Sequence, residues 1–68
     1  MKILLNNRNE AFDSYEEMSV DQLLKVKKFT FPMIIIKING KLIKKDKYST
    51  SIIKDGDDVT ALHLISGG

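Results

Sequence analysis

The chain has 68 residues, a mass of 7.7 kDa, a formal net charge of +2 and no cysteine. This length allows a single domain, and 43% hydrophobic with 29% charged residues is typical of a folded globular domain rather than a disordered chain. The lack of cysteine excludes disulfides, thiolate zinc sites and a cysteine nucleophile. No apolar run reaches the roughly 18 residues of a membrane-spanning helix, and the apolar start is too short for a signal peptide. We therefore expect a cytoplasmic protein with no membrane partner.

The basic residues give little reason to expect nucleic-acid binding. Eleven basic residues face nine acidic ones, and the lysines are scattered along the chain. Nucleic-acid modules instead concentrate basic residues on one element and place aromatic residues among them for stacking. We expect no nucleic-acid partner and keep such binding only as a distant alternative.

The N-terminal residues have the pattern of a β-hairpin. Met1, Ile3 and Leu5 fall on one face of an extended segment, as in a strand over residues 1–6 with one buried side. Residues 6–9 are rich in asparagine, which tolerates left-handed backbone, so a tight turn is expected there. Residues 10–13 are then expected to run back as a short antiparallel partner.

A helix of about ten residues is expected next. Ser19 is a good N-cap, and Gln22 three residues later completes a capping box. Val20, Leu23 and Leu24 form one apolar stripe. Lysines 25, 27 and 28 suit the negative end of the helix dipole, and we expect Pro32 to prevent continuation of the helix.

The second half of the chain reads as three strands. Residues 33–39 are the strongest strand pattern, nearly all β-branched and apolar on both faces. Asn39-Gly40 is the preferred pair for a type I′ turn, and residues 41–43 return as a short strand. Residues 44–53 are expected to form a turn or short helix that places Ile52 and Ile53 in the core. Residues 55–57 form a turn before a last strand over residues 59–65.

This order, β-β-α-β-β-β, predicts an α+β fold of the β-grasp type. One main helix packs on one face of a four- or five-stranded mixed sheet, in which the first and last strands are parallel neighbours. We expect a single domain over residues 1–66 and a flexible tail of residues 67–68. The predicted core between helix and sheet consists of Ile3, Leu5, Val20, Leu24, Ile36, Ile38, Ile53 and Val59.

The sequence offers little for catalysis or metal binding. His63 is the only histidine, and no serine lies in a Gly-x-Ser-x-Gly elbow. Asp55, Asp57 and Asp58 lack the further ligands and closing glutamate of an EF-hand, so a solvated turn is expected. We expect no catalytic residue, no metal site and no bound cofactor.

The final Gly67-Gly68 pair is the most informative feature of the sequence. Two glycines have no side chains and wide backbone freedom, so they can thread a narrow channel and deliver an α-carboxylate to the active site of another protein. Such a carboxylate can be activated by ATP and then joined to sulfur or nitrogen.

Besides the Gly-Gly ending, five stretches carry a family resemblance: Met1-Lys2-Ile3-Leu4-Leu5-Asn6, Ser19-Val20-Asp21-Gln22-Leu23-Leu24, Ile36-Lys37-Ile38-Asn39-Gly40, Lys45-Asp46-Lys47-Tyr48 and Asp55-Gly56-Asp57-Asp58-Val59. With these stretches along nearly the whole chain, the sequence resembles the ubiquitin-like sulfur carriers, and most closely the ThiS family of thiamine biosynthesis. It departs from the family at two positions: Lys45 stands where the family commonly has arginine, and Lys27 stands where a third helix leucine is common.

The resemblance implies a carrier that is a co-substrate of partner enzymes and not itself an enzyme. A ubiquitin-activating-like partner would use ATP to adenylate the Gly68 carboxylate. Sulfur from a desulfurase system would replace AMP, and the resulting thiocarboxylate would supply a thiazole synthase. The alternatives are a carrier like the small subunit of molybdopterin synthase, which is usually longer and often has prolines before the tail, another sulfur carrier, or a plain ubiquitin-like binding module.

The docking surface for the activating partner is expected on the last strand. Alternation places Val59 and Ala61 on one face and Leu62 and Leu64 on the other. The resemblance of the strand's start to the family places Val59 inward, which turns both leucines outward as an apolar docking patch. The alternative is a β-bulge that re-aims the strand and buries them.

Overall fold

The computed structural model describes residues 1–30 and 33–64 of the protein. None of the helices in these two ranges is long and apolar enough to cross a membrane. The elements follow one another as β1 (Lys2–Leu5), β2 (Arg8–Ala11), β3 (Glu17–Ser19), α1 (Val20–Val26), β4 (Ile34–Ile38), β5 (Lys41–Ile43), the 3₁₀ turn η1 (Lys45–Lys47), β6 (Ile52–Lys54) and β7 (Asp58–His63).

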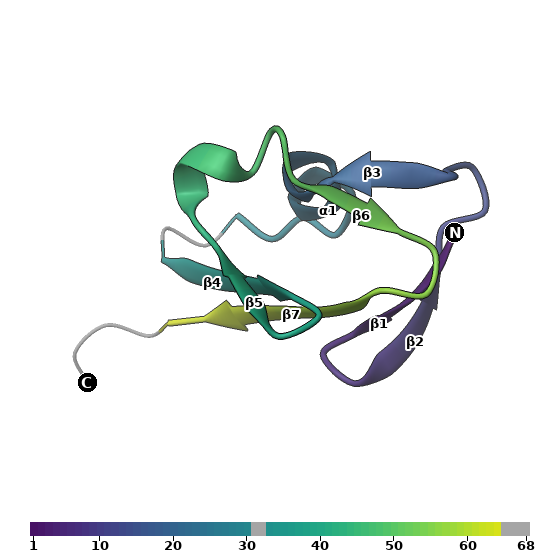
Figure 1. The fold of residues 1–68 in the computed structure, drawn as a ribbon, viewed down its shortest axis with the longest axis horizontal. Helices are drawn as coiled ribbons and strands as arrows, with labels where there is room; N and C mark the ends of the chain where they lie inside the picture. The colour runs from purple at the N-terminus through teal and green to yellow at the C-terminus, as the bar shows by residue number, and fades with distance from the viewer. Residues whose placement is uncertain (31–32, 65–68) are drawn as a thin grey trace.

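A five-stranded mixed sheet with the order β2-β1-β7-β4-β5 forms the main layer. β1 and β7 are parallel, and the other neighbours in this sheet are antiparallel. The helix α1 and a small second sheet lie on the same side of the main sheet (Figure 1). The predicted α+β fold, with its first and last strands as parallel neighbours, is therefore confirmed.

The first hairpin turns earlier than the sequence suggested. Asn6 and Asn7 have φ angles of 52° and 66°, so these two residues alone make the left-handed turn that matches the twist of a two-residue hairpin. β2 consequently begins at Arg8 and ends at Ala11, and the expected partner strand over residues 10–13 was displaced by two residues. Phe12, just beyond β2, is buried.

The helix begins as predicted. The Gln22 N–H donates to Ser19 Oγ at 3.1 Å, and the Ser19 N–H donates to Gln22 Oε1 at 2.9 Å. These reciprocal bonds are the capping box that the sequence indicated.

The end of the helix differs from the prediction, because α1 has seven residues rather than about ten. Lys28 takes up left-handed backbone with φ 57°, and its N–H donates to the Lys25 carbonyl at 3.1 Å. The next N–H, that of Phe29, donates to the Leu24 carbonyl at 2.8 Å. This pair of bonds is a Schellman motif, so the helix ends before Pro32, which lies outside the described residues.

A second sheet, formed by β3 and β6, was not predicted. Met18 faces Ile53 in its antiparallel register, and both side chains are buried. Strand alternation turns the neighbouring Ile52 outward, where it is 39% exposed. The expectation that Ile52 enters the core was therefore wrong, whereas that for Ile53 is confirmed.

The second hairpin follows the prediction. Asn39 and Gly40 have φ angles of 52° and 82° and connect β4 to β5. The Asn39 side chain accepts the Asp58 N–H at 2.9 Å and donates to the Asp57 carboxylate at 3.1 Å. This turn is thereby tied to the start of β7.

The core lies between the main sheet and the layer of α1, β3 and β6. Of the predicted core residues, Leu24 and Ile38 are only half-buried. Leu23, not Leu24, is the fully buried helix leucine, because the buried face of this short helix runs from Val20 to Leu23. The buried hydrophobic residues are Ile3, Leu5, Phe12, Met18, Val20, Leu23, Ile36, Tyr48, Ile53, Val59 and Ala61.

Candidate functional site

The glycines predicted to carry the chemistry, Gly67 and Gly68, lie outside the described residues. The chain leading to them is held firmly, because β7 lies between β1 and β4 in the main sheet. Beyond β7, the Leu64 N–H still donates to the Met33 carbonyl at 3.0 Å. β7 is thus paired with β1 at its start and with β4 along its length up to the last described residues.

Leu62 points away from the helix, as its position in the strand predicted. β7 pairs with β4 in continuous register from Ile34–His63 to Ile38–Val59, without a bulge. Val59 and Ala61 are buried, whereas Leu62 is 49% exposed. The bulge that would have buried this leucine is absent from β7.

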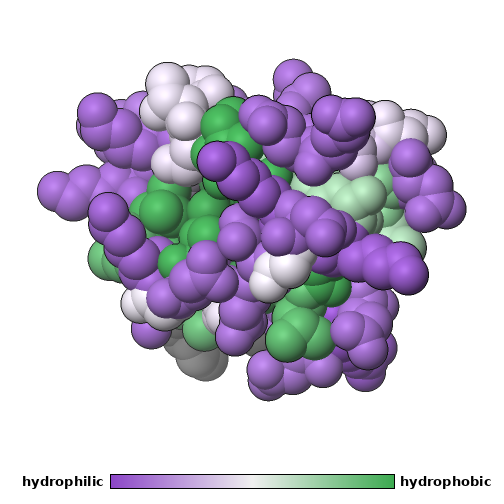
Figure 2. All heavy atoms as spheres, turned by 45° about the vertical axis from the view of Figure 1, so that its right-hand side comes forward, coloured by the Kyte–Doolittle hydropathy of each residue, from purple (hydrophilic) through white to green (hydrophobic). Residues whose placement is uncertain are grey.

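Two apolar neighbours share the outer face of the sheet with Leu62. Ile35 lies directly opposite it on β4, and Leu42 on β5 lies opposite Lys37 and is 58% exposed. We call Ile35, Leu42 and Leu62 the outer patch. On the face of the molecule shown in Figure 2, apolar side chains come to the surface in separate areas among hydrophilic ones.

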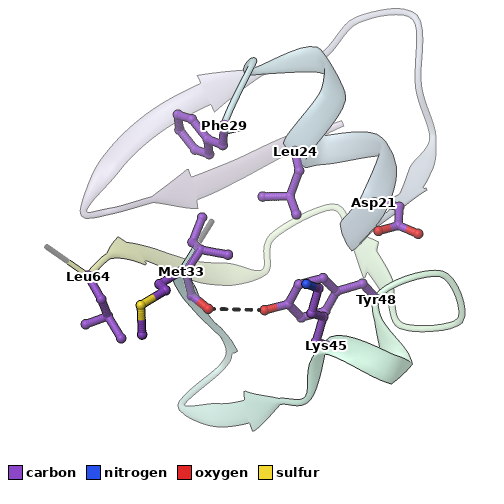
Figure 3. Close-up of a pocket in the computed structure, with 8 residues that line it drawn as sticks. Asp21, Leu24, Phe29, Met33, Lys45, Tyr48 and Leu64 are labelled. Carbon is purple, nitrogen blue, oxygen red and sulfur yellow. Dashed lines mark hydrogen bonds between the residues drawn. The ribbon is translucent and has the colours of Figure 1, made fainter. Parts of the chain in front are cut away.

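Leu64 contributes to a different surface. It is 41% exposed and lines a pocket of about 330 Å³, which we call the tail-root pocket (Figure 3). Leu24 and Phe29 approach this pocket from α1 and the segment after it, and Lys45 and Tyr48 from η1 and its end (Figure 3). Its lining residues are Asp21, Leu24, Phe29, Met33, Ile34, Lys45, Tyr48 and Leu64.

Tyr48 fixes one wall of the tail-root pocket. Its hydroxyl donates to the Ile34 carbonyl at 3.4 Å, and its own carbonyl accepts the Asp21 N–H at 3.2 Å. Burial of the ring, and secondarily the Asp21 carboxylate, raise the pKa of the Tyr48 hydroxyl above its usual value. The hydroxyl is therefore a neutral donor at neutral pH and joins β4 to η1.

Sequence reasoning did not foresee this pocket. Leu24 was assigned to the core and Leu64 to the outer face with Leu62. The Schellman motif turns the chain back after α1, so that Phe29 lines this pocket together with Leu24. The available signal was a hydrophobic residue directly after the lysines that end the helix.

The acidic residues after β6 accept hydrogen bonds from backbone N–H groups. Asp55 accepts the Lys2 N–H at 2.7 Å, and Asp57 accepts the Lys54 N–H at 2.9 Å. These bonds fit the turn that the sequence predicted. Across residues 1–30 and 33–64, no group of three or more His, Cys, Asp or Glu side chains is placed to hold a metal ion.

One helix packed on a mixed sheet whose parallel first and last strands are neighbours defines a β-grasp, ubiquitin-like protein. Within that class, the model of the ThiS family matches residues 3–68, and the chain belongs to this family. The resemblance stated from the sequence is thereby confirmed.

Solved structures of one relative support the same assignment. The chain is similar to the crystal structure of the thiamine biosynthesis protein ThiS from Geobacter metallireducens, with 26% identity, a TM-score of 0.90 and full coverage of both chains. The solution structure of a thiamine biosynthesis protein from the same organism matches with 26% identity and a TM-score of 0.82, over 100% of this chain and 88% of that one. Family and fold together assign the chain to the small sulfur-carrier proteins of thiamine biosynthesis.

Proposed function

We propose that the protein carries sulfur as a thiocarboxylate on the carbonyl carbon of Gly68. A ubiquitin-activating-like enzyme joins the Gly68 carboxylate to the α-phosphate of ATP and releases pyrophosphate. A persulfide from a desulfurase system attacks the acyl-adenylate and displaces AMP, and a second thiol of that system cleaves the sulfur–sulfur bond. The thiocarboxylate then supplies a thiazole synthase.

The family match over residues 3–68 carries this proposal, because it includes the glycine pair. The absence of cysteine fits the same chemistry, since sulfur carried by this chain has no thiol to reside on. ATP is a substrate of the partner, and the carrier itself requires no bound cofactor. The protein acts in the cytoplasm, where ATP and these partner enzymes are available.

We further propose that Leu62 contacts the adenylating enzyme as part of the outer patch. Its half-exposed side chain lies on the strand that leads to the glycines, and exposed apolar patches commonly mark protein contacts. Lys37 lies among the three patch residues and orients the partner. Leu64 contributes from the tail-root pocket, closer to the glycines.

The test uses two variants of the tail, deletion of Gly68 and Gly67→Val, with Gly67→Ala as a smaller change at the same position. We expect the deletion and Gly67→Val to abolish ATP–pyrophosphate exchange by the cognate adenylating enzyme, and Gly67→Ala to reduce it less. Thermal unfolding should remain at the wild-type temperature, because the last residues of a chain usually contribute little to a packed core. Normal exchange by the truncated protein would contradict the proposal, and loss of folding would assign the glycines a structural role instead.

A further inference from the structure

β5 is the edge strand of the main sheet that lies next to the outer patch. Within the described residues β5 pairs with β4 alone, because it is the last strand in the order of the main sheet. In a two-residue hairpin, the pair flanking the turn exchanges hydrogen bonds and the next pair does not. Ile38 and Lys41 flank the turn, so the backbone N–H and C=O of Leu42 point outward from the sheet.

The β4–β7 ladder supports this orientation of Leu42. The Asn39 N–H donates to Asp58 and the Leu64 N–H donates to Met33. Because the hydrogen-bonded positions alternate along β4, the backbone of Lys37 is turned toward β7. Leu42, which lies opposite Lys37, therefore offers its donor and acceptor to an added strand.

A groove of about 450 Å³ runs beside this edge, and its charged lining is entirely positive. Lys41, Lys44 and Lys47 form no ion pair within the described part of the chain. The nearest acidic residue in sequence is Asp46, which is exposed in η1 and does not line the groove. We call this the β5 groove; its lining residues are Lys41, Leu42, Ile43, Lys44, Lys47 and Ser51.

We propose that the β5 groove binds an acidic, extended segment of the adenylating enzyme, which adds a strand to the main sheet at Leu42. Backbone pairing at an open edge supplies affinity for an extended segment, and flanking side chains select its sequence. Three lysines without acidic partners select acidic side chains. This inference rests on the proposed function, since it names how the activating partner is held.

The groove and the outer patch share Leu42. Because of this shared residue, we propose that one partner occupies both surfaces. The Leu42 side chain belongs to the outer face, and its backbone forms the edge of the groove. A protein that covers Leu62 and Leu42 thereby reaches the open edge of β5. The adenylating enzyme is the partner proposed to contact Leu62, and it must recognise the unmodified carrier.

The experiment measures KM and kcat for the carrier in adenylation by the cognate enzyme. The double variant Lys44→Glu/Lys47→Glu should raise KM at least tenfold and leave kcat within twofold, because the groove holds a segment of the enzyme and takes no part in the reaction of the carboxylate. The control Lys25→Glu/Lys28→Glu makes the same change in net charge at the end of α1 and should change KM less than threefold. Raising the salt concentration should increase the wild-type KM, because it screens the attraction between the lysines and the acidic segment, and should lower the KM of the groove variant, because it screens the repulsion that the two glutamates introduce.

A second pair of variants tests the added strand itself. Leu42→Pro removes the outward N–H, and proline is tolerated on edge strands, whereas Leu42→Ala shortens the side chain and keeps the N–H. We expect the proline variant to raise KM further than the alanine variant. Melting temperatures identify any variant that fails to fold, and the lysine pair remains decisive if Leu42→Pro is one of them.

The outcomes separate this inference from the proposed function. Adenylation of the wild type with an unchanged KM for the groove variant would overturn the inference and leave the carrier function standing. Equal effects of the groove and control variants would also overturn it, because net charge alone would then explain the binding. No adenylation of the wild type under conditions in which the enzyme is active would overturn both.

Discussion

The side-chain amide of Asn6 pairs with the backbone of Ala61 as another strand residue would. Its Nδ2 donates to the Ala61 carbonyl at 3.0 Å, and its Oδ1 accepts the Ala61 N–H at 2.8 Å. Backbone pairing between β1 and β7 reaches Leu5 and Val59, and there the chain turns away into β2. The Asn6 side chain extends the contact with β7 past this point and satisfies two polar groups at a buried residue.

We therefore expect Asn6→Gly to lower the free energy of unfolding by about 1–3 kcal/mol, the cost of leaving buried backbone groups without partners. Glycine keeps the left-handed backbone, so the loss reports the two side-chain bonds. Asn7→Gly is the matched control, because Asn7 has the same backbone conformation and is exposed. Urea unfolding of both variants measures the difference; equal stabilities would show that the Asn6 amide contributes nothing.

The left-handed residue that ends α1 offers a stabilising substitution. Lys28 has φ 57°, a conformation that costs an ordinary residue about 1–2 kcal/mol and costs glycine little. Part of this gain is lost because glycine has more freedom in the unfolded chain. Lys28→Gly should therefore raise the free energy of unfolding by about 0.5–1 kcal/mol.

The control for this substitution is Lys25→Gly, three residues earlier and inside the helix. There glycine should lower the free energy of unfolding by about 1 kcal/mol. Both values come from chemical denaturation. Destabilisation of similar size by both glycines would contradict the Schellman end of the helix.

Because Leu62 is exposed, we expect its substitution to affect docking of the adenylating enzyme and to leave the stability of the fold nearly unchanged. Leu62→Ala should slow adenylation and change the free energy of unfolding by less than about 0.5 kcal/mol, as exposed substitutions usually do. Ile36→Ala, on the opposite face of the sheet, should cost about 2–5 kcal/mol because Ile36 is fully buried. A large loss of stability in Leu62→Ala would instead make Leu62 a core residue.

Tyr48 predicts a change of stability at alkaline pH. Because its pKa is raised in the folded state, Tyr48 loses its proton at lower pH when the chain is unfolded. Its contribution to stability is complete below the unfolded pKa of about 10 and is lost as the pH rises through the higher folded value. The free energy of unfolding of the wild type, minus that of Tyr48→Phe, should therefore fall above about pH 10.

The subtraction in this experiment removes the contribution of every other group that the wild type and Tyr48→Phe share. Urea unfolding at a series of pH values from neutral to alkaline supplies the two free energies. A constant difference across the series would show that the Tyr48 hydroxyl is not shielded from water.

Local signals in the sequence were sufficient for most of the fold. The capping box at Ser19, the Asn39-Gly40 turn and the β-branched run of β4 each act over a few residues, and all were confirmed. The order of the elements then predicted that the first and last strands are parallel neighbours in a mixed sheet, and the structure has this topology.

The second sheet and the tail-root pocket escaped prediction because they depend on contacts between distant residues, and the end of the helix did so because of an unusual local backbone conformation. β3 and β6 are three residues each and are fixed by the pairing of Met18 with Ile53. The helix end depends on Lys28 adopting a backbone conformation that lysine rarely takes. The tail-root pocket combines residues from α1, β4, η1 and the chain beyond β7, so no single stretch of sequence carries its pattern.

The most direct measurement of the central claim is the intact mass of the carrier after incubation with its adenylating enzyme, ATP and a sulfur-donating desulfurase system. The proposal predicts a gain equal to the replacement of one oxygen by sulfur, located by fragmentation at Gly68 and absent when ATP is omitted. Addition of a thiazole synthase with its other substrates should return the mass to its starting value. An unchanged mass with active partner enzymes, or sulfur attached anywhere other than the terminal carboxylate, would contradict the account.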